Sequence, residues 1–219
     1  MPLLFHRPLA DGGGLAVWHI AESEDELARL LLEYREMHGD GCDNSLISTD
    51  EDGLSYTAFK SLARRKEWLT IRILTAMFLG PQTTLRHDET GRPFVSDGNW
   101  QISISHTKYY AALAWSNCRS VGVDIEQRSN RVLRVRKKYV NDREELLAST
   151  VEGALYVWCA KETVYKMVHD SRIDLHHEVV VNRVGEDQLT AVVREQSLTL
   201  SLDDTNADFV LVWGETDIF

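Results

Sequence analysis

Cysteine and long apolar runs are both scarce in this sequence of 219 residues. The three cysteines (Cys42, Cys118 and Cys159) are widely spaced and form no zinc or redox motif, which is typical of a reducing compartment. No apolar run approaches the roughly 18 residues of a membrane-spanning helix. The first residues carry charges and consecutive glycines instead of the apolar core of a signal peptide. We therefore expect a cytoplasmic protein that does not enter a membrane.

Positive charge is also in deficit, since the formal net charge is −10. This balance disfavours general binding to nucleic acid or to an anionic membrane surface, because both require positive charge. A small polyanion remains a possible ligand if cations or a metal gather locally. The apolar fraction of 43% and charged fraction of 26% are ordinary for a globular chain of this length.

Two common catalytic motifs are missing. There is no Gly-x-x-x-x-Gly-Lys-[Ser/Thr] loop, which disfavours a Mg²⁺-dependent nucleotide hydrolase. There is no Gly-x-Ser-x-Gly elbow either, and the adjacent Ser105 and His106 are poorly placed to act as nucleophile and base. The chemistry must therefore be sought in other residues.

Helix and strand patterns alternate along the chain and predict an α+β protein. In the first part, Ser23 precedes an amphipathic helix, and Gly80-Pro81 ends a longer one. We predict strands at 15–20, 83–87, 101–105 and 109–116, a helix at 58–79, and a loop at 39–55.

The second part repeats the order of helix followed by strands. It contains a strand at 121–126, a short helix beginning at Asn141 and a long helix at 152–169. An antiparallel meander then follows, with strands at 179–181, 189–194, 198–202 and 209–213. The recurrence suggests duplication, with halves at 1–117 and 118–219.

Carboxylates gather in this second half. On a strand, Asp124 and Glu126 share one face, together with Gly122, which permits close approach. On the long helix, Glu162 and Lys166 share a side with Trp158, opposite an apolar stripe. The alternative interpretation is that Asp124 and Glu126 lie on a solvated strand face and that Glu162 lies on an ordinary helix surface. Together, however, three carboxylates and a lysine suit a hard divalent cation beside an anion.

Cationic side chains are spread over the first half. Arg65 and Arg72 lie at the border of the apolar face of their helix, either extended along the surface or reaching a phosphate. Arg92 follows a turn, and Ser105-His106 end a strand. A separate basic run, from Arg128 to Lys138, is either a solvated helix face or a docking surface for an acidic partner.

These residues in this order resemble the 4′-phosphopantetheinyl transferase superfamily. The resemblance rests on Gly122-Val-Asp-Ile-Glu126 and on Trp158-x-x-Lys-Glu-x-x-x-Lys166. It extends upstream through Arg65, Gly91-Arg92-Pro93 and Ile102–Thr107, so that it covers nearly half of the chain. The chain length is similar to that of the long, monomeric type, which activates peptide-synthetase and acyl carrier proteins.

The resemblance implies two similar α+β halves related by a pseudo-twofold axis, with the site in the cleft between them. It implies transfer of phosphopantetheine from coenzyme A to a carrier-protein serine, with release of adenosine 3′,5′-bisphosphate. Mg²⁺ would be held by Asp124, Glu126 and Glu162, with Glu162 also the predicted general base. The implied phosphate contacts are Arg65, Arg92, Ser105, His106, Lys161 and Lys166, with Arg65 and His106 assigned to the 3′-phosphate.

The chain departs from the family pattern at two places. Arg92 stands where lysine is common, which preserves the charge. No glycine follows Lys166, so the path of the next loop cannot be taken from the family. The alternative function is a catalytically idle module that binds coenzyme A or a carrier protein, but the presence of all three carboxylates disfavours it.

Overall fold

The computed structural model describes residues 2–36, 56–96, 98–183 and 185–218, so the predicted loop at 39–55 lies outside the described residues. The chain divides into two compact units, Met1–Cys118 and Arg119–Phe219, a boundary one residue from the predicted one. Each unit combines helices with antiparallel sheets and has its own apolar core. The chain is therefore of the α+β class.

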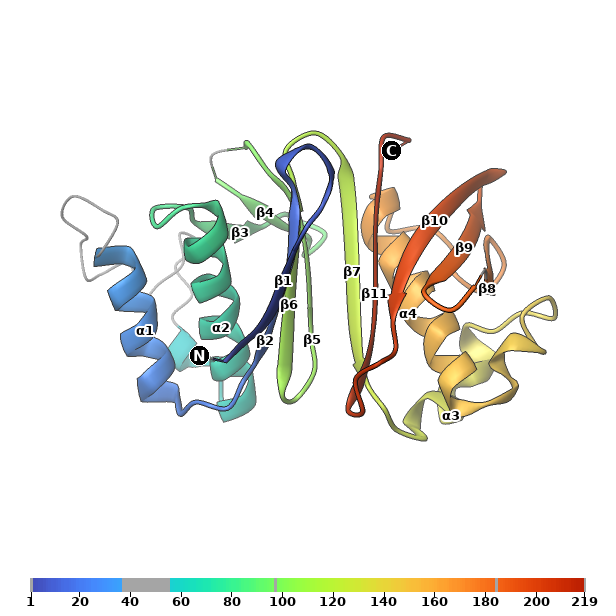
Figure 1. The fold of residues 1–219 in the computed structure, drawn as a ribbon, viewed down its shortest axis with the longest axis horizontal. Helices are drawn as coiled ribbons and strands as arrows, with labels where there is room; N and C mark the ends of the chain where they lie inside the picture. Colours follow the sequence, from blue (N-terminus) through green and yellow to red (C-terminus); the bar gives the residue numbers. More distant parts are fainter. Residues whose placement is uncertain (1, 37–55, 97, 184, 219) are drawn as a thin grey trace. The chain divides into compact units, whose positions relative to one another are not determined.

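The first unit is built on a four-stranded antiparallel sheet in the order β1-β2-β6-β5 (Figure 1). The strands are β1 (Leu3–Pro8), β2 (Gly14–His19), β6 (Tyr110–Ser116) and β5 (Gln101–His106). The predictions of β2, β5 and β6 are confirmed. β1 was not predicted, because its sequence lacks the apolar alternation and ends in proline, which suits an edge strand.

Helix α2 (Leu62–Leu79) packs on this sheet, and α1 (Glu24–Glu36) packs against α2 (Figure 1). Ser23 and Glu26 form a reciprocal cap at the start of α1, since each backbone N–H bonds the other side chain. α2 ends at the predicted residue, where Gly80 has a φ of 121°. It begins four residues later than predicted, because Ser61 caps it and residues Tyr56–Ala58 form a separate 3₁₀ turn, η3.

A short hairpin of β3 (Leu85–His87) and β4 (Pro93–Val95) completes the first unit. The predicted turn between them is confirmed. The Asp88 side chain accepts hydrogen bonds from the backbone N–H groups of Thr90 (2.8 Å) and Arg92 (3.0 Å). This turn sets the backbone from which the Arg92 side chain extends.

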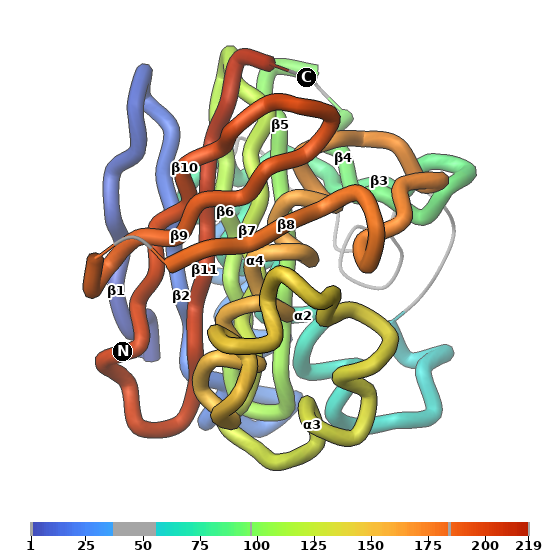
Figure 2. Tube along the Cα trace, turned by 90° about the vertical axis from the view of Figure 1, so that its right-hand side faces the viewer, coloured from blue at the N-terminus to red at the C-terminus, as the bar shows by residue number. Residues whose placement is uncertain are grey.

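The second unit is built on a five-stranded antiparallel sheet in the order β7-β11-β10-β9-β8. Its strands follow the predicted positions: β7 (Ser120–Gln127), β8 (Val179–Arg183), β9 (Gln188–Val193), β10 (Gln196–Asp203) and β11 (Phe209–Thr216). Figure 2 shows β8, β9 and β10 running as a meander. The predicted carboxylate strand, β7, is paired along its whole length with β11.

Helix α4 (Val151–Val168) packs against β7 and β11. Its predicted inward stripe is confirmed, because Val157, Ala160, Val164 and Met167 are all fully buried. Gly122 makes the contact possible, since a Cβ there would overlap Thr163 O and Met167 Cγ. The close approach that this glycine permits is therefore that of α4. Among the described helices, none is long and apolar enough to cross a membrane.

The segment between β7 and α4 is irregular. It contains α3 (Arg131–Val135) and two 3₁₀ turns, η4 (Arg136–Lys138) and η5 (Leu147–Ser149). The predicted short helix at Asn141 is wrong. Asn141 Oδ1 accepts a hydrogen bond from Arg143 N at 3.0 Å, which makes a turn where a helix start was expected.

Candidate functional site

The predicted strand and helix motifs of the second unit meet side by side. Lys166 Nζ on α4 donates to Asp124 Oδ1 (2.8 Å) and to Val123 O (2.8 Å) on β7. Trp158 Nε1, two turns earlier on α4, donates to Glu126 Oε1 at 3.0 Å. Asp124 is buried, with 4% of its surface exposed. The side of α4 that carries Trp158 and Lys166, opposite the apolar stripe, therefore faces the carboxylates of β7.

Glu162 lies on the same side of α4, between Trp158 and Lys166 in the sequence. Burial, together with the charges of Asp124 and Glu126, raises the pKa of its carboxyl group to about 7 against the opposing effect of Lys166. Burial and the charge of Asp124 also raise the pKa of Glu126. Three carboxylates thus interact electrostatically, with one lysine to offset them.

This donor set fits Mg²⁺ chemically, because carboxylate oxygens are the protein ligands that Mg²⁺ prefers. The mutual effects on the pKa values also show that the acidic groups share one environment. Within the described parts of the chain, however, no three His, Cys, Asp or Glu side chains are gathered as a ready metal cluster. Instead, Lys166 and Trp158 contact Asp124 and Glu126 directly.

Lys161 was expected beside a phosphate, and that prediction is wrong. The side chain is fully buried, and its ammonium group bonds Glu144 Oε2 (2.8 Å), Tyr139 O (2.6 Å) and Leu175 O (2.7 Å). These three acceptors match its three N–H groups. Lys161 therefore holds segments of the second unit together and has no N–H group left for a ligand.

Glu144, which was not predicted, is the fully buried partner of Lys161. Its carboxylate also accepts hydrogen bonds from the backbone N–H groups of Asn141 (3.0 Å) and Val181 (2.7 Å). The network therefore joins α4, the segment before it and β8. A glutamate within a polar, irregular stretch gives no sequence signal for such a role, because its partners are distant in the chain.

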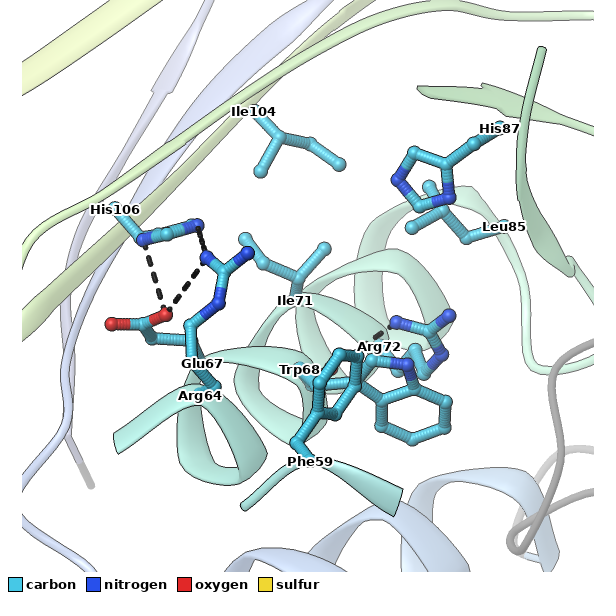
Figure 3. A pocket seen from close by; sticks show the side chains of 10 residues that line it. All are labelled: Phe59, Arg64, Glu67, Trp68, Ile71, Arg72, Leu85, His87, Ile104 and His106. Atoms are coloured by element: carbon cyan, nitrogen blue, oxygen red, sulfur yellow. Dashed lines mark hydrogen bonds and ion pairs between the residues drawn. The ribbon is translucent and has the colours of Figure 1, made fainter. Parts of the chain in front are cut away.

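In the first unit, a cavity of about 140 Å³ lies between α2, β3 and β5 (Figure 3). We call it the α2–β5 pocket. Its polar lining is mainly basic, with two arginines and two histidines beside one glutamate, and apolar side chains complete its wall. The lining residues are Phe59, Arg64, Glu67, Trp68, Ile71, Arg72, Leu85, His87, Ile104 and His106.

His106 is in this pocket as a candidate anion contact, but its arginine neighbour is not the predicted one. Arg64 Nη1 lies 3.1 Å from His106 Nε2. Arg65 bonds both carboxylate oxygens of Glu24 (3.0 and 2.9 Å) and also donates to Phe59 O. One residue along a helix is a rotation of about 100°, so adjacent arginines face different neighbours. The structure therefore places Arg64, and not the predicted Arg65, beside His106.

Ser105 and Arg92 do not line the α2–β5 pocket. Ile104 and His106 both line it, and Ser105 lies between them on β5, so alternation directs Ser105 to the other face of the strand. Arg92 Nη2 bonds Gln101 Oε1 at 3.3 Å. Both residues remain predicted phosphate contacts on the resemblance alone.

Arg72 and His87 complete the basic lining. The Arg72 guanidinium lies over the Trp68 ring, 3.3 Å from its centroid, and the residue is 5% exposed. From its spacing on the helix, Arg72 was predicted either to extend along the surface or to reach a phosphate. In the structure, Arg72 forms part of the pocket wall. His87 was predicted only as the end of a strand, because an isolated histidine gives no indication of its neighbours.

The basic run from Arg128 to Lys138 is divided by the structure. Arg128 bonds the backbone carbonyls of Asp204 and Asn206, and Arg136 bonds that of Ala148, so these two arginines brace loops. The other four cations of the run are exposed: Arg131, Arg134, Lys137 and Lys138. A cavity of about 440 Å³ adjoins them, lined by Glu126, Gln127, Ser129, Arg131, Val132, Val135, Lys138, Leu155 and Trp158.

The end of α4 explains the missing glycine after Lys166. His169 takes the left-handed conformation that glycine usually adopts there, with a φ of 60°. Ser120 Oγ lies 2.6 Å from His169 Nε2 and donates to Met167 O at 2.7 Å. The Ser120 hydroxyl group on β7 thus donates a hydrogen bond to a carbonyl group in the last turn of α4, and the loop then leads to β8.

No model of a known protein family matches the sequence, and a search of curated proteins finds no relative.

Proposed function

We propose that this chain transfers the 4′-phosphopantetheine group of coenzyme A to a serine of an apo acyl or peptidyl carrier protein. The observation that carries the proposal is that Lys166 on α4 bonds Asp124 on β7, while Asp124 and Glu126 act electrostatically on Glu162 of the same helix. Acidic groups with a lysine suit a pyrophosphate bound together with Mg²⁺. We place the reaction in the cytoplasm, where coenzyme A and carrier proteins would meet.

In the proposed reaction, the serine Oγ attacks the phosphorus that carries the pantetheine. The bond from this phosphorus to the bridging oxygen breaks, and adenosine 3′,5′-bisphosphate leaves. The serine proton passes to Glu162, whose pKa of about 7 suits a general base near neutral pH. Lys166 neutralises charge on the leaving bisphosphate. Mg²⁺, held by the carboxylates, would supply further charge neutralisation.

The α2–β5 pocket supports the choice of coenzyme A as donor. Coenzyme A carries a 3′-phosphate as well as a pyrophosphate, and we assign the 3′-phosphate to Arg64 and His106. Both have polar nitrogen atoms on the pocket lining, and apolar side chains such as Trp68 and Ile71 adjoin them. An arginine and a histidine that lie close together suit a phosphate monoester.

Intact-protein mass spectrometry tests the proposal. The chain, coenzyme A and Mg²⁺ are incubated with a panel of apo acyl and peptidyl carriers. The expected result is a mass gain equal to one phosphopantetheine on at least one carrier, with adenosine 3′,5′-bisphosphate as second product. No mass gain on any carrier contradicts the proposal.

A catalytically idle module that binds coenzyme A or a carrier is the second candidate. One observation favours it, namely that the described residues contain no ready three-ligand metal cluster. In that case, isothermal titration calorimetry detects coenzyme A or a carrier, while the carrier panel shows no mass gain. The two measurements therefore distinguish an enzyme from a binding module.

For the carrier, we propose docking on the exposed cations Arg131, Arg134, Lys137 and Lys138, because carrier proteins are usually acidic near the modified serine. The adjoining 440 Å³ cavity has apolar walls and includes Glu126, one of the three carboxylates. Exposed Leu133 and Val135 provide further apolar surface on α3. Charge attraction with apolar contact is a usual basis for protein recognition.

Charge reversal tests this docking surface. The Arg134→Glu/Lys137→Glu variant should raise the KM for the carrier severalfold and leave the KM for coenzyme A unchanged. The matched control is Arg29→Glu/Lys60→Glu, which changes the net charge equally at exposed positions of the first unit. Equal increases of the two KM values, or an equal effect in the control, contradict docking at α3.

A further inference from the structure

Three side chains of the α2–β5 pocket form a closed triangle of polar contacts (Figure 3). Glu67 Oε2 lies 3.3 Å from Arg64 Nη1 and 3.3 Å from His106 Nδ1. Arg64 Nη1 lies 3.1 Å from His106 Nε2. Both ring nitrogens of His106 thus have a partner, one acidic and one basic.

These contacts determine the protonation of the imidazole. A guanidinium group donates hydrogen bonds and accepts none, so Nε2 of His106 must be the acceptor. The ring is therefore neutral, with its hydrogen on Nδ1, and Nδ1–H donates to Glu67. In this arrangement Glu67 orients the ring, and Arg64 prevents protonation at Nε2.

The three side chains differ in their freedom to move. The side chain of Glu67 is 11% exposed, that of His106 33% and that of Arg64 58%. Glu67 is confined by its surroundings, whereas the long Arg64 side chain lies at the rim. An anion that enters the pocket can therefore attract Arg64 away from His106 without disturbing the contact between His106 and Glu67.

We propose that Glu67 is a positioning residue that makes phosphate binding in this pocket proton-coupled. When a phosphate monoester binds, Arg64 turns to it and His106 takes a proton from solvent at Nε2. The imidazolium then donates from Nε2 to the phosphate and from Nδ1 to Glu67. The ligand class, a phosphate such as the 3′-phosphate of coenzyme A, rests on the proposed function.

The charges around His106 are consistent with this coupling. From α2, Arg64, Glu67 and Arg72 line the pocket, and His87 lines it from β3. Arg64 and Arg72 oppose a second positive charge on His106 until a phosphate dianion offsets it. Glu67 favours that charge at all times, and its contact with Nδ1 persists in both states.

The proton uptake gives the pH dependence a definite sign. Since the complex holds one more proton than its components, affinity falls as the pH rises, by up to about tenfold per pH unit. Above about pH 7 the phosphate is already a dianion, so its own titration does not mask the effect. The expected result is a dissociation constant that increases between pH 7 and 8.5.

Isothermal titration calorimetry with adenosine 3′,5′-bisphosphate measures the coupling directly. Titrations at pH 7.5 in buffers with different ionisation enthalpies yield the number of protons taken up. We expect about one proton for the wild type and for His177→Gln, which removes an exposed histidine that bonds Asp174 outside the pocket, and none for His106→Gln. Glu67→Gln should reduce the uptake at least twofold, and Glu67→Asp should restore part of it.

Several outcomes overturn the proposal: no binding of the bisphosphate by the wild type, unchanged uptake in His106→Gln or Glu67→Gln, or loss of uptake in the control His177→Gln. Circular dichroism verifies that each variant is folded, and the Glu67→Asp result applies if Glu67→Gln does not fold. Carrier modification without proton uptake contradicts this inference and leaves the proposed function intact. Proton uptake without carrier modification supports this inference and contradicts the proposed function.

Discussion

The two units handle charged side chains in different ways. In the second unit, Lys166 and Trp158 on α4 meet Asp124 and Glu126 on β7, so that the two predicted motifs lie side by side. In the first unit, the predicted partner of His106 faces elsewhere, and Arg64 replaces Arg65. Trp158 and Lys166 lie about two helical turns apart and share one side of α4, as the helical periodicity predicted. Which side chain on another element each residue contacts was decided by the packing of the elements, in both units.

Two lysines of one helix, Lys161 and Lys166, also differ in how their charge is used. Both bond a carboxylate at 2.8 Å, but the side chain of Lys161 is fully buried, whereas that of Lys166 is 24% exposed. A buried, fully bonded ammonium group stabilises the fold, and a partly exposed one can also contact a ligand. For these two lysines, exposure separates the structural side chain from the candidate functional one.

The carboxylate group of the second unit should show the largest effect. Asp124→Ala and Glu162→Ala are each expected to lower carrier modification by more than about a hundredfold, because each removes charge that the proposed reaction needs. The rate is measured by mass spectrometry, and circular dichroism should show an unchanged fold. Near-normal turnover of either variant contradicts the proposed use of these residues.

The two lysines are compared by the same substitution. Lys161→Gln should lower the free energy of unfolding by about 3–5 kcal/mol, because it leaves Glu144 buried without its charged partner. Lys166→Gln should cost about 1–2 kcal/mol, yet lower carrier modification about a hundredfold. Urea unfolding and the mass assay measure the two quantities. Equal losses of stability would contradict the division of roles.

The neighbouring arginines of α2 provide a matched pair in the first unit. Arg64→Met should weaken binding of adenosine 3′,5′-bisphosphate about tenfold, since a hydrogen bond to a charged group contributes about 1.5–3 kcal/mol. Arg65→Met should change this affinity less than threefold and lower stability by about 1 kcal/mol through loss of the Glu24 pair. Calorimetry decides between them, and the reverse order would restore Arg65 as the phosphate ligand.

The smallest expected effect concerns Asp170, on the loop after α4. Hydrogen bonds from the Arg172 and Arg194 side chains lower the pKa of its carboxyl group. A lowered pKa in the folded state contributes stability above the unfolded value, near 3.8, and that contribution is lost as the pH falls below it. Asp170→Asn should therefore reduce the drop in Tm between pH 5 and pH 2.5. The exposed Asp187→Asn is the control, and an equal reduction there contradicts the assignment.

The sequence by itself determined much of the fold and part of the candidate site. The caps at Ser23 and Gly80, the inward stripe of α4 and the strands of the meander follow from local periodicity and turn chemistry, which act within a few residues. The same periodicity brought Glu162 and Lys166 to one side of α4. The alternation of side chains along a strand also places Ser105 and His106 on opposite faces of β5.

Only the tertiary structure decided which charges are buried and which side chains meet across elements. Glu144 and Lys161 pair because β8, α4 and the segment between β7 and α4 pack together. His106 meets Arg64 and Glu67 because α2 lies against β5 at one particular rotation. Such contacts depend on the packing of elements distant in the chain, and a local pattern does not determine that packing.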